Sequence, residues 1–202
     1  KPNRLEVAKE VLGDFIDARP NDKIGLVIFG GEAFTQCPLT TDHKIIKNMF
    51  GDIKAGMLDQ GTAIGLGLAD GVARVKDSKA KSKVIILMTD GVNNAGFIEP
   101  VMASEIAAEF GIKVYTIGIG TNGNALFPYA YAPNGGFLFK MMPVQIDEQL
   151  MKEIAKKTGG KYFRAQSNSS LESIYNEINK LEKTEVEELK FVNYDEKYRP
   201  LV

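Results

Sequence analysis

The sequence contains very few of the residues from which zinc sites, disulfides and thiol active sites are built. Among its 202 residues it has one cysteine, Cys37, one histidine, His43, and no tryptophan. One cysteine cannot close a disulfide within the chain, and one cysteine with one histidine cannot supply the ligands of a structural zinc site. We therefore expect Cys37 to be a small packing residue and His43 to be an exposed polar residue.

The sequence also lacks a long hydrophobic run and an excess of charge of one sign. No stretch approaches the roughly 20 apolar residues that span a bilayer, and 25 basic residues nearly cancel 26 acidic ones, which leaves a formal net charge of −1. Without a strong overall field, nothing steers the protein towards nucleic acid or an anionic membrane, so we expect no nucleic-acid partner. A hydrophobic fraction of 44% at this length is enough for one sizeable core.

What the sequence does contain is an alternation of strand-like and helix-like segments. The most distinct is Val84–Met88, five apolar residues typical of a buried strand, which end in Thr89, Asp90 and Gly91. The alternation predicts an α/β fold with a doubly wound, mostly parallel sheet flanked by helices. We expect helices over 5–18, 43–50 (capped by Asp42), 63–76, 100–110, 147–158 and 169–183, and strands over 24–29, 33–36 (an antiparallel edge strand), 84–88, 113–119 and 161–164.

Two segments depart from this alternation. Residues 120–145 combine glycine and proline with many aromatic residues, so the segment is either a folded excursion or a partner-binding loop. Residues 185–198 place apolar side chains among charges, which predicts an edge strand or an extended linker. Within the predicted helix 63–76, Gly67 and Gly71 would let the helix approach a neighbour closely.

Two oxygen donors are predicted to meet at the carboxyl edge of the sheet, where ligands bind in open α/β folds. Asp90 follows the strand Val84–Met88, and Thr62 lies in the loop Gly61–Gly65. A carboxylate and a hydroxyl suit Mg²⁺, Mn²⁺ or Ca²⁺ better than a soft metal. The alternatives are an Asp-Gly turn at Asp90 and a helix N-cap at Thr62.

Three other polar residues lie in loops that could approach the same edge, namely Asp42, Asp59 and Asn93. For these, turn and cap roles are the better prediction.

Thr62, Thr89-Asp90-Gly91 and the order of the strands resemble a von Willebrand factor A (VWA) domain over residues 5–183. The resemblance implies a metal-ion-dependent adhesion site (MIDAS), in which Thr62 matches the second motif and Asp90 the third. The first motif, Asp-x-Ser-x-Ser after the first and central strand, is absent here. We therefore expect Mg²⁺, Mn²⁺ or Ca²⁺ to bind weakly or not at all to this chain. The sheet would be completed by a strand from the tail, by a strand from another chain, or not at all.

More narrowly, Ile24–Phe29, the run from Ala33 to Asp42, Gly61–Gly65 and the run from Gly159 to Ala165 resemble bacterial aerotolerance (Bat) proteins of the BatA and BatB type. The resemblance implies a protein anchored in the bacterial inner membrane, with this domain on its cytoplasmic or periplasmic side. It also implies protein partners, among them other Bat-type proteins and a MoxR-type AAA+ ATPase system. Residues 1–184 would form the VWA domain, and residues 185–202 a tail or linker towards a membrane span.

The function that these observations favour is that of a non-catalytic protein-interaction domain, in which a divalent cation captures a carboxylate of a partner. One alternative is a scaffold in which the sheet edges and the aromatic segment 120–145 mediate assembly without an ion, including assembly into an oligomer that completes the sheet. A less favoured alternative is a phosphotransfer enzyme that uses Asp90, since no Asp-x-Asp pair follows a strand in this sequence.

Overall fold

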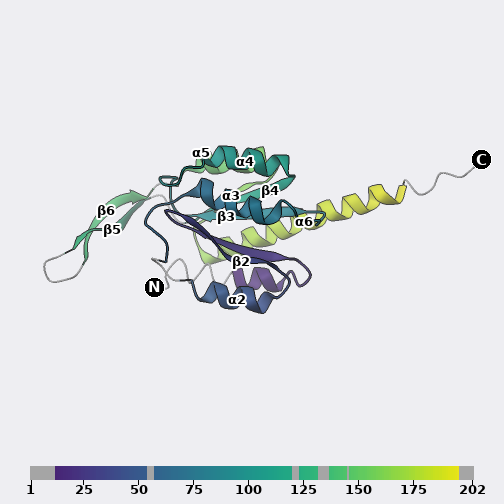
Figure 1. Cartoon of the computed structure of the whole chain (residues 1–202), viewed down its shortest axis with the longest axis horizontal. Coiled ribbons are helices and arrows are strands. Elements are labelled where there is room, and N and C mark those ends of the chain that lie inside the picture. The colour runs from purple at the N-terminus through teal and green to yellow at the C-terminus, as the bar shows by residue number, and fades with distance from the viewer. Residues whose placement is uncertain (1–11, 54–56, 120–122, 132–136, 145, 196–202) are drawn as a thin grey trace, which may run out of the picture.

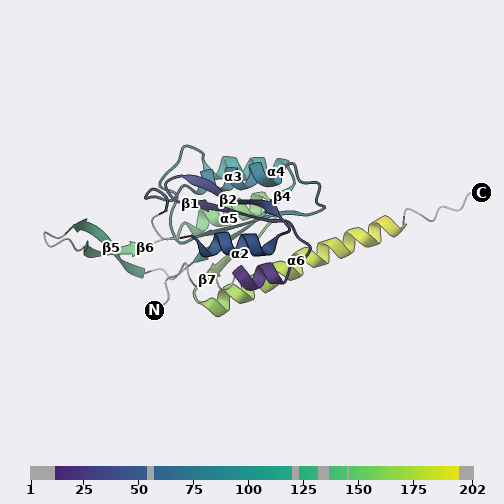
Figure 2. The same cartoon turned by 60° about the horizontal axis from the view of Figure 1, so that its bottom comes forward.

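The computed structural model describes residues 12–53, 57–119, 123–131, 137–144 and 146–195. Strands lie between two layers of helices, as Figures 1 and 2 show. One layer contains α3 (Ile64–Val75), α4 (Pro100–Glu109) and α5 (Glu148–Lys157), and the other contains the helical residues 12–17, α2 (His43–Gly51) and α6 (Asn168–Asp195). This layering confirms the α/β prediction.

A parallel sheet forms the centre of the molecule. Its strands are β3 (Lys83–Thr89), β4 (Ile112–Ile119) and β7 (Tyr162–Ala165), in the order β3-β4-β7. The middle strand, β4, is buried along most of its length because it has a partner on each side and helices on both faces. The other strands follow its register, with Lys83 opposite Ile112 and Thr116 opposite Tyr162.

A second sheet consists of β1 (Ile24–Phe29) and β2 (Ala33–Thr40), which pair in antiparallel fashion. Helix α3 packs on both sheets, because it contacts β1 of one sheet and β3 of the other. Gly67 of α3 makes this approach possible: a β-carbon there would lie 2.7 Å from the Phe29 ring. The predicted close packing of the helix at Gly67 is thereby confirmed.

The edges of β1 and β3 that do not face β2 and β4 carry no strand partner among the described residues. β3 is less buried than β4, which has a strand on each side: only Leu87 and Thr89 of the seven residues of β3 are buried. An unpaired edge leaves backbone donors and acceptors without a ladder. Completion of the sheet by a strand from another chain therefore stays a prediction.

The described part of the tail, up to Asp195, does not provide such a strand. The prediction of an edge strand or linker over 185–198 is wrong for the described residues, because α6 continues as one helix to Asp195. Residues 181–190 are rich in leucine, glutamate and lysine, which are strong helix formers, and this propensity outweighs the scattered apolar residues further on. The division of the chain at 184 stays a prediction, and α6 runs through that position without a break.

The aromatic segment after β4 is a folded excursion, as one of the two alternatives predicted. It forms an antiparallel hairpin of β5 (Gly123–Tyr131) and β6 (Phe137–Val144), with Gly123 opposite Val144. The hairpin projects from the body of the molecule at the end where β4 finishes, opposite the end where α6 leaves (Figures 1 and 2). Of the helices that the structure describes, none combines the length and the apolar character that crossing a bilayer requires.

Candidate functional site

The two predicted oxygen donors lie on adjoining loops at the carboxyl edge of the sheet. Asp90 follows β3 directly and is exposed, whereas Thr89 before it is buried. Thr62 lies in the loop that enters α3, and its Oγ1 atom is 2.9 Å from the position that a β-carbon on Gly91 would occupy. The Thr62 hydroxyl therefore packs against the residue next to Asp90, and a larger residue at 91 would displace it.

Two asparagines of the loop after Asp90 bind the backbone of the Thr62 loop. Asn94 Oδ1 accepts a hydrogen bond from the Thr62 N–H at 2.8 Å, and Asn93 Oδ1 accepts one from the Ile64 N–H at 2.9 Å. The Asn94 N–H in turn donates to the Thr62 carbonyl oxygen at 3.1 Å. These contacts fasten the two loops together and fix the position of Thr62 relative to Asp90.

The alternative in which Thr62 is the N-cap of the helix is wrong. The N-cap residue of α3 is Ala63, whose methyl side chain cannot accept a hydrogen bond from the helix. Asn93 accepts the bond from Ile64 that a local cap would otherwise accept. Because Asn93 reaches this N–H from a loop about thirty positions away in sequence, the Thr62 hydroxyl is not used for capping.

The other loop residues behave largely as predicted. Asp42 caps α2, where its side chain accepts hydrogen bonds from Lys44 N–H and Ile45 N–H. Asp59 is exposed, and its carbonyl oxygen accepts a bond from Gly31 N–H at 2.8 Å.

The two residues with reactive side chains, Cys37 and His43, lie away from the Thr62 and Asp90 loops. Cys37 is buried in β2, which confirms its packing role, and this burial raises the pKa of its thiol. His43 is half-buried rather than exposed, with its Nε2 atom 3.1 Å from the Asp22 carbonyl oxygen. Neither residue therefore contributes to a site at the carboxyl edge.

The Thr62 and Asp90 loops supply only part of the ligand set of a hard divalent cation. Thr62 and Asp90 offer two oxygen donors of the kind that Mg²⁺ prefers. Among the described residues, no group of three or more histidine, cysteine, aspartate or glutamate side chains could hold a metal ion. An ion bound by Thr62 and Asp90 would take its remaining ligands from water or from residues that the structure does not describe.

The described parts of the loops around Thr62 and Asp90 are acidic. The described residues of the three loops at this edge, 30–32, 57–62 and 90–99, include Glu32, Asp59, Asp90 and Glu99 and no lysine, arginine or histidine. All four acids are exposed. This arrangement attracts cations and repels a free carboxylate.

The opposite edge of the sheet contains a buried carboxylate that the sequence analysis missed. Glu182 of α6 is 6% exposed. It accepts hydrogen bonds from Tyr115 Oη at 2.6 Å, Ser82 Oγ at 2.7 Å and Lys113 Nζ at 3.1 Å. Burial alone would raise the pKa of Glu182, but these three bonds and the Lys113 charge outweigh burial, so the pKa lies below its ordinary value. The only signal in the sequence was one glutamate among several in a helix.

Comparison with known proteins places the chain in a family. The model of the von Willebrand factor type A domain matches residues 2–177. The chain is similar to BatB from Bacteroides thetaiotaomicron, with 34% identity and a TM-score of 0.74 over 91% of this chain and 90% of that one. It is similar also to an aerotolerance-related membrane protein from Bacteroides fragilis, with 32% identity and a TM-score of 0.72 over 89% and 90%.

A more distant neighbour carries a metal. Proximal thread matrix protein 1 from the mussel byssus, described with a zinc-occupied MIDAS motif, is 25% identical with a TM-score of 0.66, over 90% of this chain and 41% of that one. The chain spans about half the length of the curated relatives it matches, for example 53% of one from Borreliella burgdorferi at 32% identity. VWA domains commonly bind a divalent metal at this motif, and the Bacteroides neighbours are Bat and aerotolerance-related proteins. On the family match and these neighbours, the chain belongs to the von Willebrand factor type A domain family.

Proposed function

We propose that this chain is a non-catalytic protein-interaction domain of a membrane-anchored, aerotolerance-type protein. In the whole protein, a divalent cation at the carboxyl edge would bind a carboxylate of a partner. The observation that carries the proposal is the convergence of Thr62 on the Asp90 loop, with the Thr62 hydroxyl packed against Gly91. Thr62 would bind the ion through its hydroxyl, and Asp90 would bind it directly or through water.

The electrostatics of the loops at the carboxyl edge support a role for a cation. The described residues of these loops carry four exposed acids and no basic side chain, which would repel an acidic partner, and a divalent ion would reverse this locally. Mg²⁺ and Mn²⁺ accept a further oxygen ligand readily, so the ion would link the protein to its partner without any reaction. The partners that we propose are other Bat-type proteins and a MoxR-type AAA+ ATPase system at the bacterial inner membrane.

A titration of the ion tests this proposal. We expect Mn²⁺ or Mg²⁺ to bind weakly to the 202-residue chain and more tightly to the whole protein, and we expect Thr62→Ala with Asp90→Ala to abolish binding in both. Calorimetry measures the affinity for the ion. The control is Asp42→Ala, which removes an acid that caps α2 and does not belong to the Thr62 and Asp90 loops. Partner binding that persists undiminished in chelator and in the double variant would count against the ion.

The second candidate is a scaffold that binds partners without an ion. Two observations favour it, namely the small set of metal-ligating side chains among the described residues and the unpaired edges of β1 and β3. A strand from a second protein could pair with both edges. Hydrogen exchange of the β1 and β3 amides distinguishes the cases, because slow exchange at the outer edges in the oligomer, and fast exchange in the monomer, would indicate strand addition.

A further inference from the structure

Three consecutive backbone N–H groups at the start of α3 donate hydrogen bonds to other loops. The donors belong to Thr62, Ala63 and Ile64, and their acceptors are Asn94 Oδ1 at 2.8 Å, the Gly30 carbonyl oxygen at 2.6 Å and Asn93 Oδ1 at 2.9 Å. Unbonded N–H groups at a helix N-terminus would attract an anion. Because these three are bonded, an anion would have to break the contacts, whereas a cation at the Thr62 hydroxyl would not.

Asn94 binds both backbone polar groups of Thr62. Its Oδ1 atom accepts the bond from the Thr62 N–H, and its own N–H donates to the Thr62 carbonyl oxygen at 3.1 Å. Two bonds to one residue fix the place of that residue and the orientation of its peptide groups. Since threonine is β-branched and its side chain adopts few rotamers, a fixed backbone also limits where the Thr62 hydroxyl can lie.

Close packing of the backbone restricts the same loop further. Gly61, just before Thr62, adopts a φ of +128°, and a β-carbon there would lie 2.9 Å from the Ala95 side chain. A β-carbon at Gly91 would lie 2.9 Å from Thr62 Oγ1. The Thr62 loop therefore has little room to move relative to the loop that follows Asp90, and the chain itself makes every one of these contacts.

The rigidity of the loop bears on which cation the site would take. Mg²⁺ requires an octahedral arrangement at about 2.0–2.1 Å, keeps several waters and needs few protein oxygens, whereas Ca²⁺ takes about six to eight oxygens at about 2.3–2.6 Å in a flexible arrangement. The described loops bring two predicted donors to the site, Thr62 and Asp90, and Thr62 is held in place. A small number of donors and a fixed loop both favour Mg²⁺.

We propose that Asn94 is a positioning residue of the ion site, which holds the Thr62 hydroxyl in place before an ion binds and thereby makes the site select Mg²⁺ over Ca²⁺. The selection of the ion rests on the proposed function, in which a cation binds at Thr62 and Asp90. The holding of the loop does not, because the two bonds between Asn94 and Thr62 require no ion. Asn94 acts on the ion only through Thr62, as residues that orient a metal ligand do.

Amide hydrogen exchange of the 202-residue chain in chelator tests whether Asn94 holds the loop. We expect the Thr62 N–H to exchange about tenfold faster in Asn94→Ala than in the parent chain, because its acceptor is removed. Asn94→Asp keeps an Oδ1 acceptor and should restore slow exchange. The matched control is Asp42→Ala, which removes the cap of α2 and should leave the exchange of the Thr62 N–H unchanged. The urea midpoint of each variant verifies that it folds.

Calorimetry of the whole protein tests the selection of the ion, with Mg²⁺ and Ca²⁺ titrated separately. We expect the parent protein to bind Mg²⁺ more tightly than Ca²⁺. Asn94→Ala should weaken Mg²⁺ binding by about tenfold and Ca²⁺ binding by less, because a loosened loop can adapt to the larger ion. The ratio of the two affinities should therefore fall in Asn94→Ala and stay unchanged in Asp42→Ala. A purely structural role of Asn94 would lower stability without changing this ratio.

Slow exchange of the Thr62 N–H in Asn94→Ala, fast exchange in Asn94→Asp, or tighter binding of Ca²⁺ than of Mg²⁺ by the parent protein would overturn the proposal. An affinity ratio that Asn94→Ala leaves unchanged would overturn it as well. If Mg²⁺ binding is then still abolished by Thr62→Ala with Asp90→Ala, the proposed function stands and only the role of Asn94 fails. If neither ion binds to the whole protein, the proposed function and the selection of the ion fail together.

Discussion

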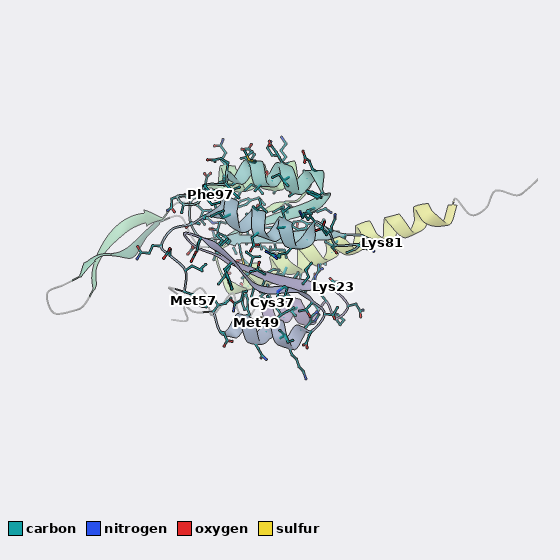
Figure 3. All side chains as sticks on the ribbon, viewed as in Figure 1. Lys23, Cys37, Met49, Met57, Lys81 and Phe97 are labelled. Atoms are coloured by element: carbon teal, nitrogen blue, oxygen red, sulfur yellow. The ribbon has the colours of Figure 1, made fainter. Side chains whose placement is uncertain are left out.

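The two edges of the parallel sheet differ in charge, in burial and in how far their polar groups are satisfied. The carboxyl edge has four exposed acids on the loops around Thr62 and an exposed Phe97. The amino edge buries Glu182 under three hydrogen bonds, and the connection before β3, residues 76–82, carries three lysines and one acid. Lys23 and Lys81 lie at that end of the molecule, and Phe97 and Met57 lie at the other (Figure 3).

This difference separates stability from binding. Buried and fully bonded polar groups hold elements together, and Glu182 joins α6 to the start of β3 and β4. Exposed groups on fixed loops add little to stability and are positioned to contact something else. Substitution of the buried Glu182 cluster should therefore change the free energy of unfolding alone, and substitutions at the carboxyl edge should change ion binding, with a loss of stability only where they disturb packing or a cap.

The largest expected effect comes from Glu182→Ala. The variant removes a buried carboxylate that accepts bonds from Tyr115, Ser82 and Lys113, so we expect a loss of about 3 kcal/mol in the free energy of unfolding. Urea denaturation measures it. Glu177→Ala, which removes an exposed ion pair with Lys161, should cost less than about 1 kcal/mol. Equal losses in the two variants would mean that the buried cluster does not stabilise α6.

A pair of glycines allows a matched comparison of the two edges. A β-carbon at Gly65 would overlap the Ile98 carbonyl oxygen, and one at Gly160 would overlap the Val114 carbonyl oxygen. We expect Gly65→Ala and Gly160→Ala each to cost about 2 kcal/mol through overpacking. Only Gly65→Ala should also reduce Mn²⁺ affinity in the calorimeter, because it displaces the loop that follows Asp90 and holds Thr62. Similar Mn²⁺ affinities in both variants would contradict this.

Two helix caps provide a smaller contrast. Asn93→Ala removes the bond to Ile64 N–H of α3, and Asp42→Ala removes the bonds to the first turn of α2. Each should lower the free energy of unfolding by about 1 kcal/mol. Calorimetry with Mn²⁺ then separates them, since Asn93→Ala alone loosens the Thr62 loop and should reduce ion affinity. If both variants bind the ion as the parent chain does, Asn93 has no role in positioning Thr62.

The smallest expected effect is that of lowering the pH, which should leave the free energy of unfolding almost unchanged near neutral pH. Because the folded pKa of Glu182 is lowered, its ionised form stabilises the fold fully above the ordinary glutamate pKa of about 4.3. That contribution is lost as the pH falls through the lower, folded pKa. Denaturation between pH 7 and pH 3 should show a flat region and then a decline, and Glu182→Gln should make the decline shallower. An identical decline in the variant would assign it to other carboxylates.

The sequence allowed much of the fold to be predicted, because hydrophobic periodicity and caps are local. Ile24–Phe29 forms a strand with the predicted bounds, and Asp42 caps its helix. The convergence of Thr62 on the Asp90 loop was also predictable, since the carboxyl ends of strands meet at one edge.

The rest depended on contacts between distant positions. The bonds from Asn93 and Asn94 to the Thr62 loop join residues about thirty apart, and no local pattern indicates them. Glu182 resembles the other acids of its helix in sequence, and only tertiary packing buries it. The length of α6 was underestimated because its apolar residues were weighed above its leucine, glutamate and lysine content.

The direction of α6 determines how the domain can be presented. Beyond Glu182 the helix continues from position 183 to Asp195, about 20 Å, and its end lies on the side of the molecule away from the β5–β6 hairpin (Figure 1). Phe97, which belongs to the same edge as the Thr62 and Asp90 loops, lies at the opposite end of the molecule (Figure 3). An attachment at the far end of α6 would therefore leave that edge accessible.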